Sequence, residues 1–455
     1  MFETYSINCI NSIINMGHNP NSKSLFYRVF RNYVKLVTDG LYYKNVYVLG
    51  KENLPAPNQP AIMVSNHQNC LSDPLALATF ISDRKPHFLA RANVFKHPVA
   101  DKFLRHLGLL PAYRLEYEGK GALQDNFKTF DKAVDAMLNG GTVILYPERG
   151  HQDKRWLGHF FMGYLKIAFR AAELSDFKQD IMVVPSCNHY SHYHHMQGDI
   201  MIQFGKPISL QPYYEQYRQH PRQTMIEINN MVRERVSDLM LNIEDVENYE
   251  AIDFLRENGY GKRFARKHGW ASKILPEKLH SDKTLAQKLK AAKERYPEKM
   301  EKLYNDCMTL RNEINDMKIR DWIFDKEPSF LRVAINAIML MVLFPLFLVS
   351  MVPNILLFVI PEFFKAKLLK DHMFFSSFNI GVSVFITIPL FYIIPFIVMC
   401  FTTKFYIALS YLIFCPLALL FSWYYIRWTS RCLGMMRYRS QKYAPRIEKL
   451  RNLRE

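Results

Sequence analysis

Between residues 45 and 210 the chain alternates short apolar runs with longer stretches of helical periodicity. Segments such as DPLALATFISD (73–83) and HFFMGYLKIAFRAAEL (159–174) repeat apolar residues every three or four positions, as amphipathic helices do. This alternation predicts an α/β domain with a mostly parallel central sheet flanked by helices. The strand-like runs are NVYVLG (45–50), AIMVSN (61–66), HFLAR (87–91), TVILYP (142–147), IMVVPS (181–186) and IMIQFG (200–205).

Two regions flank this domain, and both have helical patterns. Residues 1–44 include SLFYRVFRNYVKLV (24–37), which predicts an amphipathic helix that packs on the domain or lies on a membrane surface. The first residues include an acid and an interrupted apolar run, so we expect no signal peptide. Residues 211–330 are charged and helical, with one narrow apolar seam that favours docking within the chain over a coiled coil. The seam consists of Met300, Leu303, Cys307, Leu310, Ile314 and Met317.

The region 331–426 contains three apolar runs without a charged residue, at 333–360, 373–403 and 405–426. Each is longer than the roughly 20 residues that an α-helix needs to cross a bilayer. The tail 427–455 holds nine Lys and Arg against two acids. The positive-inside rule places this tail, the basic region before the runs and the lysines at 365–370 on one side. We therefore expect transmembrane α-helices that make two full crossings, plus one re-entrant element that turns near Pro345, Pro353 and Asn354, with both flanks cytoplasmic.

Composition narrows the class of partner. A chain of 455 residues is too long for one core, and its net charge of +17 calls for an anionic partner. Because the basic residues bracket the membrane runs and no nucleic-acid recognition motif occurs, membrane lipids are the expected partner and nucleic acid is not. The seven scattered cysteines favour a reducing compartment.

The stretch SNHQNCLSDP (65–74) places His67 and Asp73 directly after a strand-like run. In a parallel sheet, active sites form where loops leave the carboxyl ends of strands. A carboxylate that accepts the proton of one ring nitrogen makes the other nitrogen a base. The alternative is that Asp73 or Ser72 only caps the helix that begins near Pro74.

A second strand exit, GTVILYPERGHQDKRW (141–156), carries Glu148, Arg149, Lys154 and Arg155. Guanidinium and ammonium groups there predict a cradle for a phosphate, while Glu148 would hold a substrate hydroxyl or order an arginine. Arg114 lies in another loop, within GLLPAYR (108–114).

A cluster of histidines in NHYSHYHH (188–195) is a possible zinc site. Because no cysteine or carboxylate lies beside it to complete a ligand set, a surface loop is favoured, and no metal is expected.

Together these motifs resemble those of the glycerolipid acyltransferases, which include glycerol-3-phosphate and lysophosphatidate acyltransferases. The family's N-H-x4-D motif is similar to Asn66, His67 and Asp73 with one extra residue, as in a longer-spaced branch of the family. The resemblance covers about residues 45–210. Further matches are Gly108–Arg114 to a Gly-x5-Arg loop, Tyr146–Glu148 to an F-P-E-G motif, Val183–Pro185 to a V-V-P strand and the FGKPI segment at 204–208.

The resemblance implies that 45–210 is the acyltransferase domain of a membrane-bound enzyme, in a bacterial inner membrane or its equivalent, with this domain on the cytoplasmic side. His67 would be the catalytic base, oriented by Asp73. Acyl-CoA or acyl-carrier protein would be the cosubstrate, with no cofactor, and glycerol 3-phosphate the acceptor. The alternatives are a lysophosphatidate acceptor or, in another class, a non-catalytic lipid-binding protein. The substrate-binding residues implied are Asn66, Arg114, Glu148, Arg149, Gly150, Lys154 and Arg155.

Overall fold

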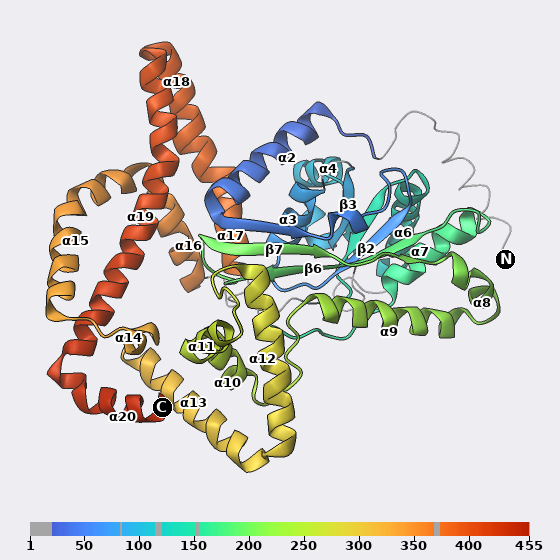
Figure 1. Cartoon of the computed structure of the whole chain (residues 1–455). Helices are drawn as coiled ribbons and strands as arrows, with labels where there is room; N and C mark the ends of the chain where they lie inside the picture. Colours follow the sequence, from blue (N-terminus) through green and yellow to red (C-terminus); the bar gives the residue numbers. More distant parts are fainter. Residues whose placement is uncertain are drawn as a thin grey trace. The chain divides into compact units, whose positions relative to one another are not determined.

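The computed structural model of the chain shows two compact units (Figure 1). The first unit comprises Met1–Tyr193 with Gly198–Met240, and the second comprises His194–Gln197 with Leu241–Glu455. The structure describes residues 21–81, 84–113, 121–148, 150, 154–367 and 374–454.

An eight-stranded sheet forms the centre of the first unit, in the order β1-β7-β6-β2-β5-β3-β4, with β8 paired to β6. Each of the six apolar runs picked out in the sequence contributes a strand. The sequence pattern did not indicate β4 or β8. The strands are β1 (Tyr43–Leu49), β2 (Ala61–Ser65), β3 (Pro86–Arg91), β4 (Leu109–Ala112), β5 (Thr142–Leu145), β6 (Met182–Tyr190), β7 (Gly198–Phe204) and β8 (Ile208–Ser209).

Most of the sheet is parallel, as predicted. Strands β6, β2, β5, β3 and β4 run in one direction, whereas β7 and β8 are antiparallel to β6 and β1 is parallel to β7. The central strand β2 is buried at all five positions, which explains its unbroken apolar sequence. The carboxyl ends of β2 and β5 lie side by side, because Val64 pairs with Leu145.

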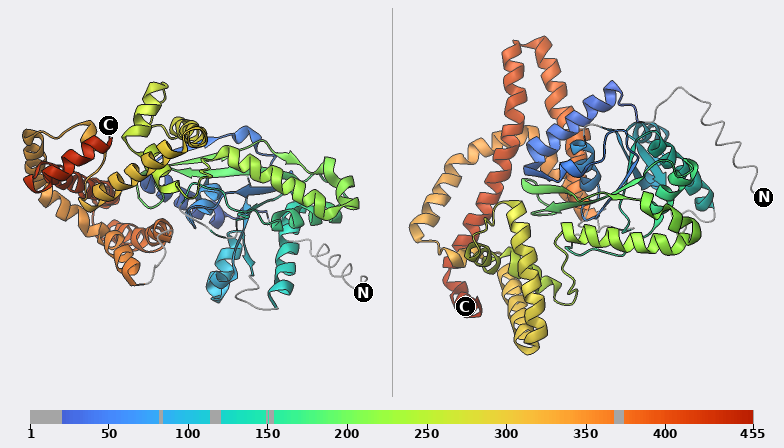
Figure 2. Two further views of the ribbon diagram at one scale, coloured as in Figure 1. Left: turned by 90° about the horizontal axis from the view of Figure 1, so that it is seen from below. Right: turned by 45° about the vertical axis from the view of Figure 1, so that its right-hand side comes forward.

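Helices cover both faces of this sheet (Figures 1 and 2). On one face, side chains of α6, α7 and α9 form a single apolar core with Ile62, Val64 and Val183 of the sheet. Figure 1 shows α2 and α3 on the other side of the sheet. The helices of this unit are α2 (Leu25–Val37), α3 (Ser72–Phe80), α4 (Pro98–His106), α6 (Gly121–Leu138), α7 (Gly163–Leu174), α8 (Tyr214–Gln219) and α9 (Pro221–Leu239).

The first unit extends beyond residue 210, where the sequence pattern had placed the end of the domain. Helix α9 belongs to this unit because Ile228, Val232 and Val236 are fully buried in its core. The other positions of α9 include six charged residues, which is why the sequence grouped it with the charged region 211–330.

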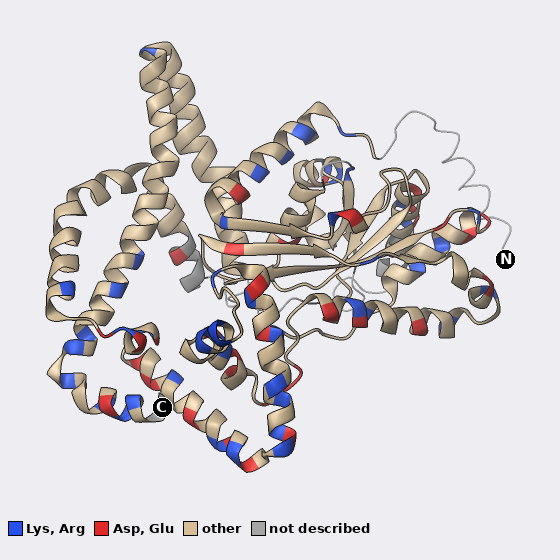
Figure 3. Ribbon diagram, in the orientation of Figure 1, with Lys and Arg blue, Asp and Glu red and all other residues tan. Residues whose placement is uncertain are grey.

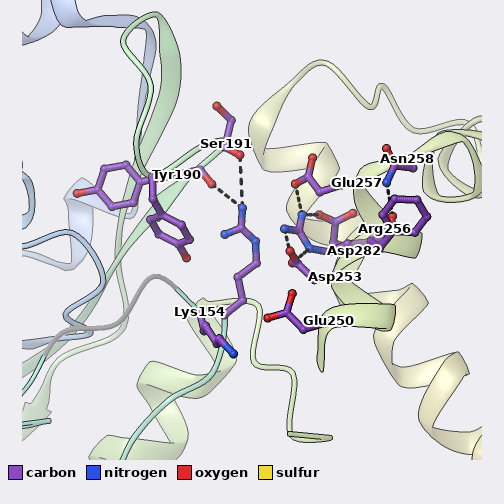
Figure 4. A network of polar contacts seen from close by, with 12 residues as sticks. Lys154, Tyr190, Ser191, Glu250, Asp253, Arg256, Glu257, Asn258 and Asp282 are labelled. Atoms are coloured by element: carbon purple, nitrogen blue, oxygen red, sulfur yellow. Dashed lines mark hydrogen bonds and ion pairs between the residues drawn. The ribbon is translucent and has the colours of Figure 1, made fainter. Parts of the chain in front are cut away.

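The second unit begins with a group of soluble-type helices. The apolar seam of residues 300–317 is buried in it: Leu310 and Ile314 of α13 pack with Ile447 and Leu450 of α20. In the same unit Arg256, 4% exposed, is held by the carboxylates of Asp253, Glu257 and Asp282 (Figure 4). The helices are α10 (Tyr249–Glu257), α11 (Gly259–Lys267), α12 (Leu275–Arg295), α13 (Pro297–Asp316), α14 (Trp322–Asp325) and, at the end of the chain, α20 (Ala444–Arg454).

Three helices among the described residues are long and apolar enough to cross a membrane: Phe330–Ile360, Phe374–Thr402 and Phe405–Arg439. The first is interrupted by a 3₁₀ turn, Val352–Asn354, after which the chain leaves α15 in a new direction (Figures 1 and 2). This turn falls at Pro353 and Asn354, where the sequence led us to expect a re-entrant element. The elements are α15 (Phe330–Met351), α16 (Ile355–Lys367), α17 (Phe374–Val382), a π-helical stretch (Ser383–Ile393), α18 (Ile394–Thr402) and α19 (Phe405–Arg439).

Buried polar side chains connect these apolar helices. Asn354 donates to the backbone oxygens of Ser350 (3.0 Å) and Cys415 (3.3 Å) and accepts from the hydroxyl of Tyr392. Ser350 and Ser422 are hydrogen-bonded at 2.6 Å. Because hydrocarbon offers no competing hydrogen bonds, such contacts fix which helix faces meet.

Candidate active site

His67 and Asp73 lie at the carboxyl end of β2 and are in direct contact. Strand β2 ends at Ser65, α3 begins at Ser72, and the intervening loop brings Nδ1 of His67 within 2.8 Å of Oδ2 of Asp73. The capping alternative is wrong, because the cap position of α3 is Leu71 and no side chain caps the helix. Asp73 instead reaches back over the loop that precedes it.

The Asp73 carboxylate is held by donors on both oxygens. Besides His67, Oδ2 accepts from the backbone N–H groups of Gln68 and Asn69, each at 2.9 Å. Oδ1 accepts from the Tyr190 hydroxyl at 2.6 Å and from Nδ2 of Asn188 at 3.4 Å. Asp73 is fully buried, so these bonds set the orientation of its carboxylate.

Tyr190 and Asn188 reach this site because β6 continues past the end of β2. They are alternate residues of one strand, so their side chains point to the same face. Burial, reinforced by the charge of Asp73, raises the pKa of Tyr190 well above its usual value, which keeps its hydroxyl protonated as a donor. The sequence analysis missed both residues; the signal that it could have used is the continued alternation of VVPSCNHY.

Asn66 is fully buried, and its side chain forms hydrogen bonds with the backbone of β6. Its Nδ2 donates to the carbonyl of Asn188 at 3.0 Å, and its Oδ1 accepts from the N–H of Asn188 at 2.8 Å. These two bonds continue the pairing of β2 with β6 by one side chain. The structure thus places Asn66 beneath the site as a scaffold, whereas the sequence analysis had assigned it to substrate binding.

Glu148 connects two loops at this edge of the sheet. Its Oε1 accepts from the backbone N–H of His67 at 2.9 Å, and its Oε2 accepts from that of Gly158 at 2.8 Å. A Cβ at position 158 would lie 3.0 Å from Oε2, so the glycine permits this close approach. Burial raises the pKa of Glu148, although both hydrogen bonds act in the opposite direction. Glu148 therefore positions the backbone that carries His67.

Tyr146, at the exit of β5, stacks on the His67 imidazole. The ring centroids are 4.3 Å apart and the planes differ by 21°. The His67 side chain remains 20% exposed, so a small molecule can reach the ring. With its proton on Nδ1, shared with Asp73, the imidazole presents Nε2 as the nitrogen that can accept a proton.

The basic residues predicted at this edge have different environments. Arg155 is 4% exposed, donates from Nη2 to the backbone oxygen of Tyr190 at 3.2 Å, and lies over the Tyr193 ring. Lys154 is partly buried, with Nζ 4.9 Å from the centroid of the Trp156 ring.

The remaining predicted positions give less information. Gly150 is exposed, and Arg114 and Arg149 lie outside the described residues. His189 of the histidine cluster is buried within β6 rather than in a surface loop. Among the described residues, no group of three or more His, Cys, Asp or Glu side chains could hold a metal ion.

Comparison with known proteins gives matches to the part of the first unit that contains the candidate site. Residues 45–188 match the family model described as Acyltransferase. Glycerol-3-phosphate O-acyltransferase 2 from Saccharomyces cerevisiae is 26% identical over 129 residues, which are 28% of this chain and 17% of that protein. 1-acyl-sn-glycerol-3-phosphate acyltransferase LPAT1, chloroplastic, from Arabidopsis thaliana is 26% identical over 128 residues, which are 28% of this chain and 33% of that protein.

The chain thus spans one third or less of the length of these two relatives. Among solved structures, the 1-acyl-sn-glycerophosphate (LPA) acyltransferase, PlsC, from Thermotoga maritima is similar at 19% identity with a TM-score of 0.35. That match covers 52% of this chain and 88% of that chain. At this TM-score the likeness adds nothing to the topology described above.

Proposed function

We propose that this chain, whose residues 45–188 form a domain of the acyltransferase family, transfers a fatty acyl group from an acyl thioester to a hydroxyl of a glycerol phosphate at a membrane. The observation that carries the proposal is the 2.8 Å contact between His67 Nδ1 and Asp73 Oδ2. The three apolar helices support a membrane setting, which suits an enzyme whose product carries an acyl chain.

In the mechanism that follows, His67 is the general base. Its Nε2 removes the proton from the acceptor hydroxyl as that oxygen attacks the thioester carbonyl. The tetrahedral intermediate then expels the thiolate, which takes up the proton from the imidazolium. Asp73 holds the ring and stabilises its positive charge during the step. Acyl group and proton are both accounted for, and no covalent enzyme intermediate is required.

For the acceptor we favour glycerol 3-phosphate, with 1-acylglycerol 3-phosphate as the alternative. The longer interval between His67 and Asp73 supports the first choice, and the similar proteins include enzymes named for each substrate. We assign the phosphate to Arg114, Arg149 and Lys154 and omit Arg155, because its guanidinium donates to a backbone carbonyl and is buried. The acyl donor is acyl-CoA or acyl-carrier protein.

We further propose that the first unit and the basic tail lie on the cytoplasmic side. The tail holds nine basic residues, whereas the turn between the second and third apolar helices holds only Lys404. Such an asymmetry is typical of a tail that stays in the cytoplasm.

The test is acyl transfer by purified membranes that contain the full chain or its His67→Ala variant. Glycerol 3-phosphate, dihydroxyacetone phosphate and 1-acylglycerol 3-phosphate are compared as acceptors with a labelled acyl-CoA. Loss of the general base is expected to reduce turnover by about 10²- to 10⁴-fold. His97→Ala, at an exposed histidine that directly precedes α4, is the matched control and should retain full activity.

Two outcomes contradict the proposal. Undiminished activity of His67→Ala would remove the imidazole from the mechanism. Binding of lipid phosphates without turnover of any acceptor would instead indicate a lipid-binding protein.

A further inference from the structure

A basic segment of the second unit lies outside the site described above. Residues 258–276, which contain all of α11, include no acid and five cations. Four of these cations belong to α11, and Figure 3 shows basic positions gathered on this helix. Aromatic and aliphatic residues are interleaved with them. The cations are Lys262, Arg263, Arg266, Lys267 and Lys273.

The aromatic residues of this segment pack into a compact platform. His268 stacks on Trp270, with ring centroids 5.0 Å apart and planes 14° apart, and lies 4.3 Å from the ring of Phe264. Trp270 in turn meets His280 of α12 edge-on at 4.7 Å. These contacts hold the loop after α11 against α12, so the segment presents its cations from a fixed surface.

Most of the cations on this surface lack an acidic partner. Arg263 pairs with Asp325 at 3.7 Å. Lys262, Arg266, Lys267 and Lys273 are exposed, and among the residues that the structure describes none of these four forms an ion pair. Their charge is therefore available to an anion from outside the chain.

Two contacts, at the first residue and at the middle of α11, fix it close to the start of the first apolar helix. The N–H of Gly259 donates to Asp321 Oδ2 at 2.7 Å, and Arg263 pairs with Asp325. These two acids bracket α14, and Trp322 of α14 packs against the cluster that joins α15 to α19. Only a short connection separates α14 from Phe330, the first residue of α15. Helix α11 thus lies at the level where the chain enters the apolar helices.

We propose that the exposed face of residues 258–276 binds the anionic headgroups of the bilayer that the apolar helices cross. Unpaired lysines and arginines beside Trp and Tyr are the composition of an interfacial helix. Tyr260 and Ile274, 42% and 41% exposed, supply the apolar contacts of such a surface. An acidic protein would match the charge alone, whereas a bilayer matches the charge, the exposed apolar residues and the position beside α14.

The experiment is lysine footprinting of the full chain in lipid nanodiscs. Nanodiscs of phosphatidylcholine alone are compared with nanodiscs that also contain phosphatidylglycerol, and acetylation of each lysine is followed by mass spectrometry. The matched control sites are Lys299 and Lys302 of α13, which are exposed and lie beyond the 21 residues of α12. That helix spans about 30 Å, so the control lysines lie far from residues 258–276 along α12.

The expected result is that acetylation of Lys262, Lys267 and Lys273 slows about threefold or more in the anionic nanodiscs, while Lys299 and Lys302 are unaffected. About 0.5 M NaCl should remove the difference, since it shortens the screening length to roughly 4 Å. Equal labelling in the two nanodiscs would overturn the proposal. So would protection that appears only when acyl-carrier protein is added, because the partner would then be an acidic protein. Lysine acetylation and its dependence on NaCl can be measured whether or not the protein transfers acyl groups. The test therefore remains valid if the proposed activity is not found.

Discussion

Tyr190→Phe removes one hydroxyl and no other atom from the candidate site. That hydroxyl donates to Asp73 Oδ1 at 2.6 Å, and both residues are fully buried. A hydrogen bond to a charged group is worth about 1.5–3 kcal/mol. The substitution leaves Oδ1 with only the longer bond from Asn188 Nδ2, at 3.4 Å. Nearly all of the bond energy is therefore lost.

If that energy is lost from the transition state, kcat falls by about 10- to 150-fold. The KM for the acceptor should stay constant, because Tyr190 holds the carboxylate that orients the base. A second signature distinguishes positioning from damage to the fold. With fewer donors, Asp73 attracts the imidazolium more strongly, so the acidic limb of the pH–rate profile should move to higher pH.

The assay is steady-state acyl transfer in reconstituted membranes over a range of pH. Tyr43→Phe is the matched control: its ring lies 6.2 Å from that of Tyr190, it is 5% exposed, and its hydroxyl makes no bond to Asp73 among the described residues. Its kcat should change by less than about threefold. Equal losses in the two variants, or a fall in kcat without a shift of the acidic limb, would refute the reasoning.

Three further substitutions test the fold and the scaffold of the site. Glu148→Gln places an amide N–H against one of two backbone N–H donors, so kcat should fall and the protein should lose about 1–3 kcal/mol of stability, seen as a lower unfolding temperature. An unchanged kcat would contradict this. Burial, with a smaller contribution from Lys85, lowers the pKa of His87 from 6.5 to about 4, so His87 stabilises the fold fully above pH 6.5 and progressively less as the pH falls toward 4. The free energy of unfolding, measured with urea, should fall by about 2 kcal/mol between pH 7 and pH 5, and His87→Gln should largely abolish this pH dependence. The same pH dependence in both proteins would contradict the prediction. Asn354→Leu deletes three buried bonds among the apolar helices and should lower stability in detergent by about 1–2 kcal/mol, whereas no change would mean that packing alone joins them.

Sequence reasoning predicted those residues of the candidate site that depend on local pattern. His67 and Glu148 follow uninterrupted apolar runs, and runs of this kind become adjacent parallel strands whose ends meet. The sequence pattern could not predict the role of Tyr190, because 117 positions separate it from Asp73 and only the pairing of β2 with β6 brings them together.

Strand β4 was missed for a different reason. Pro111 lies inside it, and proline argues against a strand in the interior of a sheet. The strand nevertheless forms because β4 is the last in the order of the sheet, where an edge tolerates a residue without an N–H.

Glu148 accepts hydrogen bonds from two different loops at the candidate site. Because this side chain joins the N–H groups of His67 and Gly158, the segment between 148 and 158 starts and finishes at the same fixed point. Both ends of this segment are therefore anchored by a side chain that lies outside its interior. If the proposed function is correct, exchanging residues of that interior would be a direct way to alter the choice of acceptor alcohol.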